Sequence, residues 1–235
     1  MGLRRRSRRS NVVDYVSAGP VGVSPTFWRL LLAEPLAGFD VLDVGTGSGR
    51  LALALAPLCR RVVGIDRDAG ALAEARQRAD AASLRNVEFT EGDAEKRGDY
   101  FEIAADWENP DLIVAHLCVS DDIIENASKS LQRGRVLAMV AFHTDQWRET
   151  GRASRFAYDE ARMRAQLVEC GFTVEHLEVE REVQHFTSVE EALAAAIGLQ
   201  ERWRADGRWF NYVKFLEEGG RTLTRSHLVV KARRI

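Results

Sequence analysis

Val41-Leu42-Asp43-Val44-Gly45-Thr46-Gly47-Ser48-Gly49-Arg50 is the stretch that decides the fold of this chain. Its first four residues are apolar except for one acid and predict a buried strand. Three alternating glycines follow, and we expect a helix to begin at Leu51. Glycine adopts backbone angles that a Cβ forbids and lets a ligand approach the main chain closely. A strand, a glycine-rich turn and a helix N-terminus with free N–H groups together predict a nucleotide-binding edge.

The glycine spacing favours one kind of nucleotide. A dinucleotide fingerprint reads G-x-G-x-x-G, whereas this chain reads G-x-G-x-G, with Arg50 after the third glycine. Asp43 in the strand would repel a diphosphate and attract a ligand that carries an ammonium and a sulfonium. S-adenosylmethionine is such a ligand. At these residues the chain resembles the class I S-adenosylmethionine-dependent methyltransferases, whose first motif reads like D-x-G-x-G-x-G. A structural glycine turn or an NAD site is the alternative.

The resemblance implies that several residues of the first motif hold the cofactor, namely Asp43, Gly45, Thr46, Gly47 and Gly49. A second buried strand at 61–66 then ends in Asp66. An acid at this place in a βαβ unit accepts hydrogen bonds from ribose hydroxyls, and it stands about 20 residues after the glycine loop. NAD enzymes share this feature, so Asp66 indicates a nucleoside without identifying it. The resemblance implies that Arg67 lies along the adenine.

A third motif follows the strand expected at 86–90. Glu91-Gly92-Asp93-Ala94 is similar to the x-G-D-A turn of the family. The resemblance implies that Asp93 accepts a hydrogen bond from the adenine amino group and that the backbone N–H of Ala94 reaches a ring nitrogen. A plain Asp turn is the alternative, but three motifs in the family's order favour the cofactor role.

Apolar strands and helical segments alternate along the chain and predict an α/β fold, a Rossmann-like doubly wound sheet of seven strands. The resemblance implies that the sheet is mostly parallel with an antiparallel last strand. We expect strands at 41–44, 61–66, 86–90, 111–117, 135–141, 172–179 and 222–233. We expect helices at 51–58, 69–82 and 121–131, and one after residue 156 whose buried face is Ala161, Ala165 and Val168.

The sequence divides into two parts. Residues 1–38 form an N-terminal arm and a cap helix, with Ser24 as N-cap and Pro25 at the first helical position. Residues 39–235 form the methyltransferase domain, with a helical insertion at about 182–221. The insertion is either a lid or substrate wall, or a packing or dimerisation element. In the resembling enzymes a leading segment often covers the cofactor, which makes Tyr15 and Phe27 candidates, although core packing fits Phe27 better.

Two histidines are candidate general bases, because a hydroxyl or ammonium acceptor must lose a proton. His116 follows the fourth strand and His143 follows the fifth, so both are expected at the same sheet edge. His116 is also a candidate cofactor contact. A histidine at such a place is more often a plain pocket wall than a base. The loop 142–156 lies at this edge as well, where open α/β sheets bind ligands.

Composition and charge limit the classes of partner and site that this chain can have. The net charge is −2 and becomes −7 without Arg4, Arg5, Arg6, Arg8 and Arg9, so the body is mildly acidic and nucleic acid is possible but not favoured as a partner. Three widely spaced cysteines indicate a reducing compartment, neither a disulfide framework nor a zinc site. No apolar run approaches the roughly 20 residues of a membrane span. We expect no metal and no membrane partner.

These observations predict a cytoplasmic S-adenosylmethionine-dependent methyltransferase that acts on a small-molecule or carrier-bound acceptor and releases S-adenosylhomocysteine. Two alternatives stay open. The arginine tail would serve an RNA methyltransferase by contacting phosphate. A non-catalytic partner subunit that binds S-adenosylmethionine would contain the same three acids, Asp43, Asp66 and Asp93. A homodimer is also possible.

Overall fold

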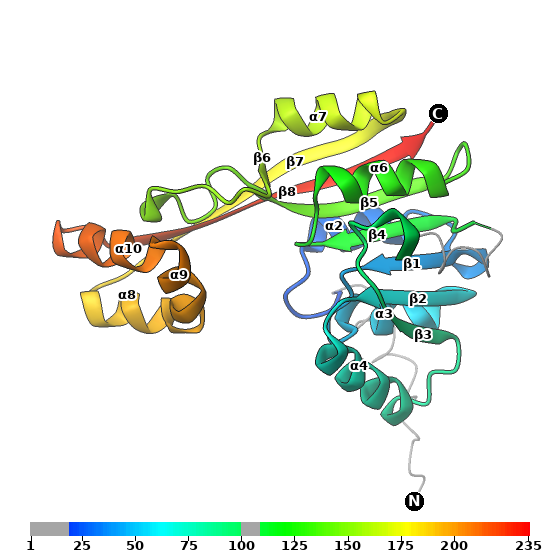
Figure 1. Cartoon of the computed structure of the whole chain (residues 1–235), viewed down its shortest axis with the longest axis horizontal. Coiled ribbons are helices and arrows are strands. Elements are labelled where there is room, and N and C mark those ends of the chain that lie inside the picture. Colours follow the sequence, from blue (N-terminus) through cyan, green and yellow to red (C-terminus); the bar gives the residue numbers. More distant parts are fainter. Residues whose placement is uncertain (1–18, 100–108) are drawn as a thin grey trace, which may run out of the picture.

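The computed structural model describes residues 19–99 and 109–235 of the chain (Figure 1). The expectations for Tyr15 and for the N-terminal arginines concern residues outside these ranges. Within the described ranges, no helix has the length and apolar character needed to cross a bilayer.

A single mixed sheet forms the centre of the fold. Its strands are β1 (Asp40–Val44), β2 (Arg61–Asp66), β3 (Val87–Glu91), β4 (Leu112–His116), β5 (Val136–His143), β6 (Ala157–Tyr158), β7 (Phe172–His185) and β8 (Thr222–Arg234). The order is β3-β2-β1-β4-β5-β8-β7, and β8 runs antiparallel to both of its neighbours. This confirms the predicted seven-stranded sheet with an antiparallel last strand. The two-residue β6, which pairs in parallel with β5, was not predicted.

Helices cover both faces of the sheet (Figure 1). One face carries α2 (Pro25–Leu32), α3 (Arg50–Leu55) and α4 (Ala69–Ala81), and the other carries α6 (Asp121–Ser130) and α7 (Glu160–Glu169). Alternate strand residues serve the two layers: Val41 and Val62 pack with the first set, and Leu42 and Val63 with the second. Because both of their faces are buried, the central strands β4 and β5 are apolar along nearly their whole length, whereas the edge strand β3 is only partly buried and carries polar residues.

Local signals set most helix ends. The hydroxyl of Ser24 accepts a hydrogen bond from the backbone N of Phe27 at 3.1 Å, which confirms the predicted N-cap of α2.

The predicted buried face of α7 is wrong. Met163 and Leu167 are fully buried, whereas Val168 is 60% exposed. These two large side chains stand one turn apart and bury more apolar area than alanines would, so they define the inner face.

The β7–β8 hairpin extends beyond the carboxyl edge of the sheet. Pairing between β5 and β8 ends at Phe142 and His227, but β7 and β8 continue to pair as far as His185 and Thr222. The hairpin overhang is therefore Arg181–His185 paired with Thr222–Ser226. β7 ends at His185, six residues beyond the end predicted at 179, and most of this additional length forms the overhang.

Three helices cap the hairpin overhang, α8 (Val189–Ala196), α9 (Gln200–Asp206) and α10 (Arg208–Glu217), which we call the helical segment. In Figure 1 it lies beside the carboxyl edge of the sheet, with α9 toward the rest of the molecule. It has its own buried core around Trp203, Tyr212 and Leu216. Within the insertion predicted at about 182–221, the apolar stripe at 193–197 and the i, i+3, i+4, i+7 pattern at 209–216 predict two helices, and α9 is the additional one. The remaining short turns are 3₁₀ helices at Leu36–Gly38, Ala56–Leu58, Arg148–Thr150 and Ile197–Leu199.

Candidate functional site

A cavity of about 280 Å³ lies at the carboxyl edge of the sheet, at the point where the strand order changes direction between β1 and β4. Ligands of open α/β sheets bind at this point. We group the lining residues by the elements that carry them, and name the two groups after the roles expected from the sequence motifs. The cofactor half is the group at the ends of β1, β2 and β3, among them Gly45, Asp66, Arg67, Asp93, Ala94 and Glu95. The acceptor half is the group that follows β4, lies at the end of β5 or in the loop after it, or belongs to α9: Leu117, Cys118, Val119, Ile123, Phe142, Phe156 and Arg202.

The glycine loop brings the main chain to the cavity wall. Gly45, Gly47 and Gly49 all have positive φ values of 66°, 54° and 79°. A Cβ at Gly45 would stand 2.4 Å from the Sγ of Cys118, so no larger residue fits without displacement. A Cβ at Gly47 would meet no atom within 4 Å. The loop is therefore closely packed at its first glycine and open at its second, which lets a ligand approach the backbone there.

Asp43 lies under the loop rather than on the cavity wall. Its carboxylate is 2% exposed and accepts hydrogen bonds from the Thr46 hydroxyl at 2.7 Å and from the backbone N of Ala52 at 3.1 Å. Burial raises the pKa of Asp43 to about 7; the two hydrogen bonds oppose the shift, and the nearby charge of Asp66 adds to it. Asp43 thus joins the loop to α3.

Asp66 connects the tip of β2 to the glycine loop. One carboxylate oxygen accepts from the backbone N of Gly47 at 2.7 Å, and the other accepts from the backbone N of Asp68 at 3.0 Å. Each oxygen has a second lone pair that can accept a further hydrogen bond. Asp66 and Arg67 both line the cavity, so the second motif lies where the sequence predicted.

The third motif forms the adjacent wall. The backbone N of Asp93 donates to the carboxylate of Asp99 at 3.0 Å, and the carboxylate of Asp93 accepts from the backbone N of Glu95 at 3.1 Å. Asp93 and Ala94 line the cavity beside Asp66. A glycine-lined wall, two carboxylates at neighbouring strand ends and an adjacent arginine fit an adenosyl group with its ribose hydroxyls.

His116 lies on the other side of β4. Its Nδ1 is 3.3 Å from a guanidinium nitrogen of Arg50, and its ring centroid is 6.0 Å from that of Phe27. Burial lowers the pKa of His116 to about 4, and the positive charges of Arg50 and His227 contribute to the shift. The cavity lining does not include His116. Phe27 itself is fully buried in the core, as expected.

His143 is part of the sheet rather than of a loop. Its Nδ1 accepts a hydrogen bond from the backbone N of Asp145 at 3.1 Å and lies 3.0 Å from the hydroxyl of Ser226. The proton of a neutral ring therefore belongs on Nε2, which lies 3.4 Å from the carboxylate of Glu160. The side chain is 6% exposed and does not line the cavity. The structure thus brings neither candidate base to the cavity, and their catalytic roles stay predictions.

Cys118 lines the cavity, and its thiol donates to the carbonyl oxygen of Val44 at 2.8 Å. Burial, together with the nearby carboxylates of Asp43 and Asp66, strongly raises the pKa of this thiol. A protonated, hydrogen-bonded thiol is a poor nucleophile. The contact with Val44 fits a packing role for Cys118. Among the residues that the structure describes, no group of three or more His, Cys, Asp or Glu side chains could hold a metal ion.

Sequence reasoning did not find most of the acceptor half. Phe142 and Phe156 bound the loop 142–156, which the sequence indicated as ligand-binding, but neither was selected. Nothing in the sequence connected Arg202 with the cofactor motifs, because α9 was not predicted.

Comparison with known proteins identifies the family. A family model described as "Methyltransferase domain" matches residues 36–220. The solved structure of an S-adenosylmethionine-dependent methyltransferase from Mesorhizobium loti superimposes with a TM-score of 0.55 at 18% identity, covering 91% of this chain and 99% of that one. At this identity the superposition shows the fold alone.

Several curated relatives match the chain over short segments, and two of them represent different kinds of acceptor. Protein-L-isoaspartate O-methyltransferase of Halorhodospira halophila is 46% identical over 63 residues, which are 27% of this chain and 29% of that protein. tRNA (uracil-5-)-methyltransferase homolog A of Mus musculus is 50% identical over 58 residues, 25% of this chain and 10% of that protein. The family model covers most of the chain, so this protein belongs to the class I S-adenosylmethionine-dependent methyltransferases, whose cofactor is S-adenosylmethionine.

Proposed function

We propose that this protein transfers a methyl group from S-adenosylmethionine to a small-molecule or carrier-bound acceptor. One observation carries the proposal: the cofactor half and the acceptor half belong to one continuous cavity. A ligand bound against Asp66 and Asp93 therefore shares its chamber with any molecule bound against Phe142 and Phe156. The cavity volume of about 280 Å³ lies just below the roughly 300–1,000 Å³ of ligand pockets and suits small ligands.

The residues of the cofactor half have distinct tasks in this proposal. Asp66 accepts from the ribose hydroxyls, and Asp93 accepts from the adenine amino group. The backbone N–H of Ala94 reaches a ring nitrogen, and Arg67 lies along the adenine. The loop from Gly45 to Gly49 supplies the close main-chain surface. Asp43 and Thr46 support that loop from below, without touching the ligand.

When bound, the cofactor supplies a methyl group activated by a sulfonium. The protein aligns the acceptor with it and excludes water, and alignment alone lowers barriers by about 7–11 kcal/mol in ideal intramolecular cases. The acceptor half holds no carboxylate or imidazole among its described residues, and its thiol is engaged with Val44. Alignment is therefore the main contribution that we propose. The variants His116→Gln and His143→Gln test the two predicted bases. A changed pH dependence of methyl transfer in one variant would identify the replaced histidine as the base.

Two alternatives have specific tests. The arginine tail and the name of the mouse relative motivate an RNA acceptor. Deleting residues 1–10 should then weaken RNA binding and flatten its salt dependence, and no RNA binding by the full chain would exclude it. A non-catalytic subunit would bind S-adenosylmethionine without turnover for any acceptor class.

The proposal is tested by calorimetry with S-adenosylmethionine and S-adenosylhomocysteine, followed by a labelled-methyl transfer screen over small molecules, carrier-bound acyl groups and RNA. We expect both compounds to bind at one site and label to reach a non-nucleic-acid acceptor. Binding of NADH in place of either compound would overturn the proposal, as would label reaching RNA alone.

The setting in the cell is part of the same proposal. All three cysteines, Cys59, Cys118 and Cys170, are free thiols. Free thiols fit a reducing compartment, and we place the protein in the cytoplasm. A homodimer stays a prediction, testable by sedimentation.

A further inference from the structure

The acceptor half of the cavity has an unusual composition. Its walls are apolar and include two aromatic rings, Phe142 and Phe156, with Leu117 and Ile123 beside them. Its one formal charge among the described lining residues is the guanidinium of Arg202. The carboxylates Asp66, Asp93 and Glu95 all belong to the cofactor half. The two halves thus differ in charge: three carboxylates and Arg67 line the cofactor half, whereas Arg202 is the one charged side chain among the described residues of the acceptor half.

Arg202 is available to a ligand. No hydrogen bond or ion pair joins its guanidinium to any residue in the described part of the chain. Arg208 on the next helix differs, because it is bound by Asp206 at 2.7 Å and by backbone carbonyls. A guanidinium without a partner offers two parallel N–H groups that match a carboxylate or phosphate.

Packing fixes α9 at the cavity. Trp203, the neighbour of Arg202, is fully buried and contacts the rings of Trp147 and Tyr212, with centroids 5.2 and 5.6 Å away. The ring of Trp147 in turn lies 5.8 Å from that of Phe142 on the cavity wall. A continuous row of aromatic rings therefore connects the core of the helical segment to the cavity.

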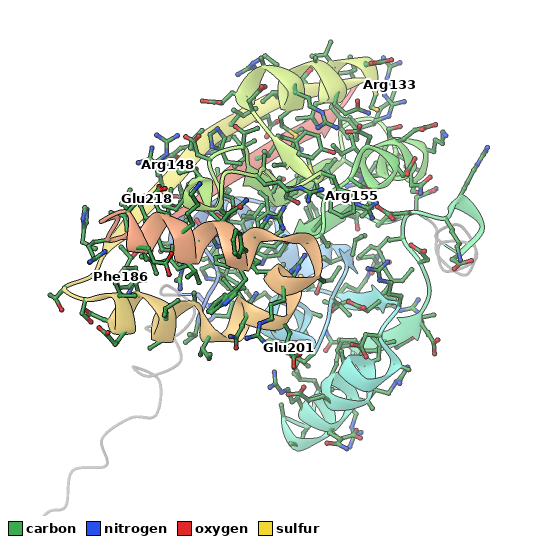
Figure 2. The ribbon with its side chains drawn as sticks, turned by 60° about the vertical axis from the view of Figure 1, so that its left-hand side comes forward. Arg133, Arg148, Arg155, Phe186, Glu201 and Glu218 are labelled. Carbon is green, nitrogen blue, oxygen red and sulfur yellow. The ribbon has the colours of Figure 1, made fainter. Side chains whose placement is uncertain are left out.

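Hydrogen bonds join the helical segment to the loop that carries Phe156. Arg208 donates to the carbonyl oxygens of Arg152 at 3.3 Å and Ala153 at 3.2 Å, and Arg152 donates to the carbonyl oxygen of Asp206 at 2.9 Å. In Figure 2, Arg155 and Glu201 lie at the end of the helical segment that borders the sheet, whereas Phe186 and Glu218 lie at the far end. The loop and α9 thus form one wall.

We infer that Arg202 binds an anionic group of the methyl acceptor, so that the acceptor is a molecule with an apolar, aromatic body and a carboxylate or phosphate. This inference rests on the proposed function and adds the substrate class to it. The carboxylate of the cofactor is the competing partner. We assign Arg202 to the acceptor because it reaches the cavity from α9 of the helical segment, whereas the residues that we propose for the adenosyl group stand at the ends of β1, β2 and β3.

Calorimetry with matched probes tests the inference. The protein is first titrated with S-adenosylhomocysteine, and the loaded protein is then titrated with 4-hydroxybenzoate against 4-hydroxybenzamide and with 1-naphthyl phosphate against 1-naphthol. Each pair differs in the anionic group. Three variants are compared with the wild type: Arg202→Gln, Arg202→Lys and the control Arg204→Gln, whose exposed side chain lies on α9 away from the cavity.

We expect one of the anions to bind the wild type and Arg204→Gln roughly tenfold or more tightly than its neutral partner, as charge-assisted hydrogen bonds imply. Arg202→Gln should lose this preference, Arg202→Lys should retain part of it, and S-adenosylhomocysteine should bind all four proteins alike. Equal binding of both members of each pair to the wild type, no binding of either anion, or a preference that survives in Arg202→Gln would overturn the inference. Weaker S-adenosylhomocysteine binding by Arg202→Gln alone would assign Arg202 to the cofactor. If the wild type does not bind S-adenosylhomocysteine, the proposed function itself fails.

Discussion

The carboxylate of Asp66 at the tip of β2 accepts a 2.7 Å hydrogen bond from the backbone N of Gly47 in the loop after β1. This contact joins the ends of two neighbouring strands, β1 and β2. The same side chain lines the cavity. Asp66 therefore shapes the loop, and in the proposed function it also binds the nucleoside.

Asp66→Ala should weaken S-adenosylhomocysteine binding by tenfold or more, because hydrogen bonds to a charged group contribute about 1.5–3 kcal/mol each. Calorimetry measures the loss. The matched control is Asp68→Ala, which removes the N-cap of α4. This control should cost about 1 kcal/mol of stability and leave the affinity unchanged. Equal affinities for wild type and Asp66→Ala would contradict the assigned role.

Asp43 predicts a pH dependence of stability that is opposite to that of most acids. Its folded-state pKa of about 7 lies above the unfolded value near 3.8. The folded protein thus binds the extra proton between these values, so the contribution of Asp43 is fully present below pH 4 and is lost as the pH rises toward 7. A pKa that differs by one between the folded and unfolded states corresponds to about 1.4 kcal/mol of stability.

Asp43→Asn isolates this contribution, since the amide oxygen can accept the same two hydrogen bonds. Urea unfolding from pH 4 to 8 measures the free energy of unfolding of both proteins. The wild-type value should fall relative to that of Asp43→Asn as the pH rises to 7, and the difference between the two values should stay constant above pH 7. A constant difference over the whole range would show that the carboxyl is ionised throughout.

The glycine loop provides a matched pair of substitutions. Gly45→Ala places a Cβ against Cys118, whereas Gly47→Ala meets open space, and both have positive φ. Gly47→Ala should therefore cost only the backbone strain, about 1–2 kcal/mol, while Gly45→Ala should lower the melting temperature clearly further. Thermal unfolding compares the two. Similar melting temperatures would mean that Cys118 moves aside freely.

Glu149 secures the loop after β5 to the hairpin overhang. Its side chain is 3% exposed and accepts from the backbone N of Thr224 at 3.0 Å and from the hydroxyls of Thr224 and Thr222 at 2.6 and 3.2 Å. Glu149→Ala should lower the free energy of unfolding by at least the contribution of one hydrogen bond to a charged group, which is about 1.5–3 kcal/mol.

Urea unfolding followed by tryptophan fluorescence measures this loss, because Trp147 and Trp203 lie in the affected core. Glu218→Ala is the control, since Glu218 is exposed and its Lys214 partner is 3.8 Å away. Exposed pairs contribute about 0–1 kcal/mol. A Glu149→Ala variant as stable as this control would show that the loop docks without the carboxylate.

The cofactor half was predictable because its signals are local. Gly45, Asp66 and Asp93 each stand at a strand end that an apolar run marks in the sequence. Parallel strands then bring these ends to one edge without any further information. Asp43 is the partial exception: its motif position was clear, but only the structure shows that it supports the loop from beneath.

Both histidines stand at the predicted edge of the sheet, at the ends of β4 and β5, but the direction of their rings was not predictable from a strand end. His116 continues the alternation of Leu112 and Val114, whose side chains pack toward α2 and α3. This alternation could have indicated that its ring points the same way. His143 was expected in a loop, but β5 extends through it and β6 pairs alongside, so its ring is enclosed.

Arg202 was not predictable from pattern. Its place depends on how far β7 and β8 extend past β5, and pairing register is a property of the assembled sheet. It depends also on the row of rings from Phe142 to Tyr212, which links three separate stretches of chain. The residue pattern of α9 alone indicates neither the register of the strands nor the row of rings.

In our proposal Asp66 and Asp93 hold an adenosyl sulfonium compound in the cavity, and the decisive measurement is titration of the full chain with S-adenosylmethionine. We expect one binding site in the wild type and no detectable binding when both residues are replaced by Ala in a variant that still unfolds cooperatively. Binding of equal strength in the two proteins, or none in the wild type, would contradict it.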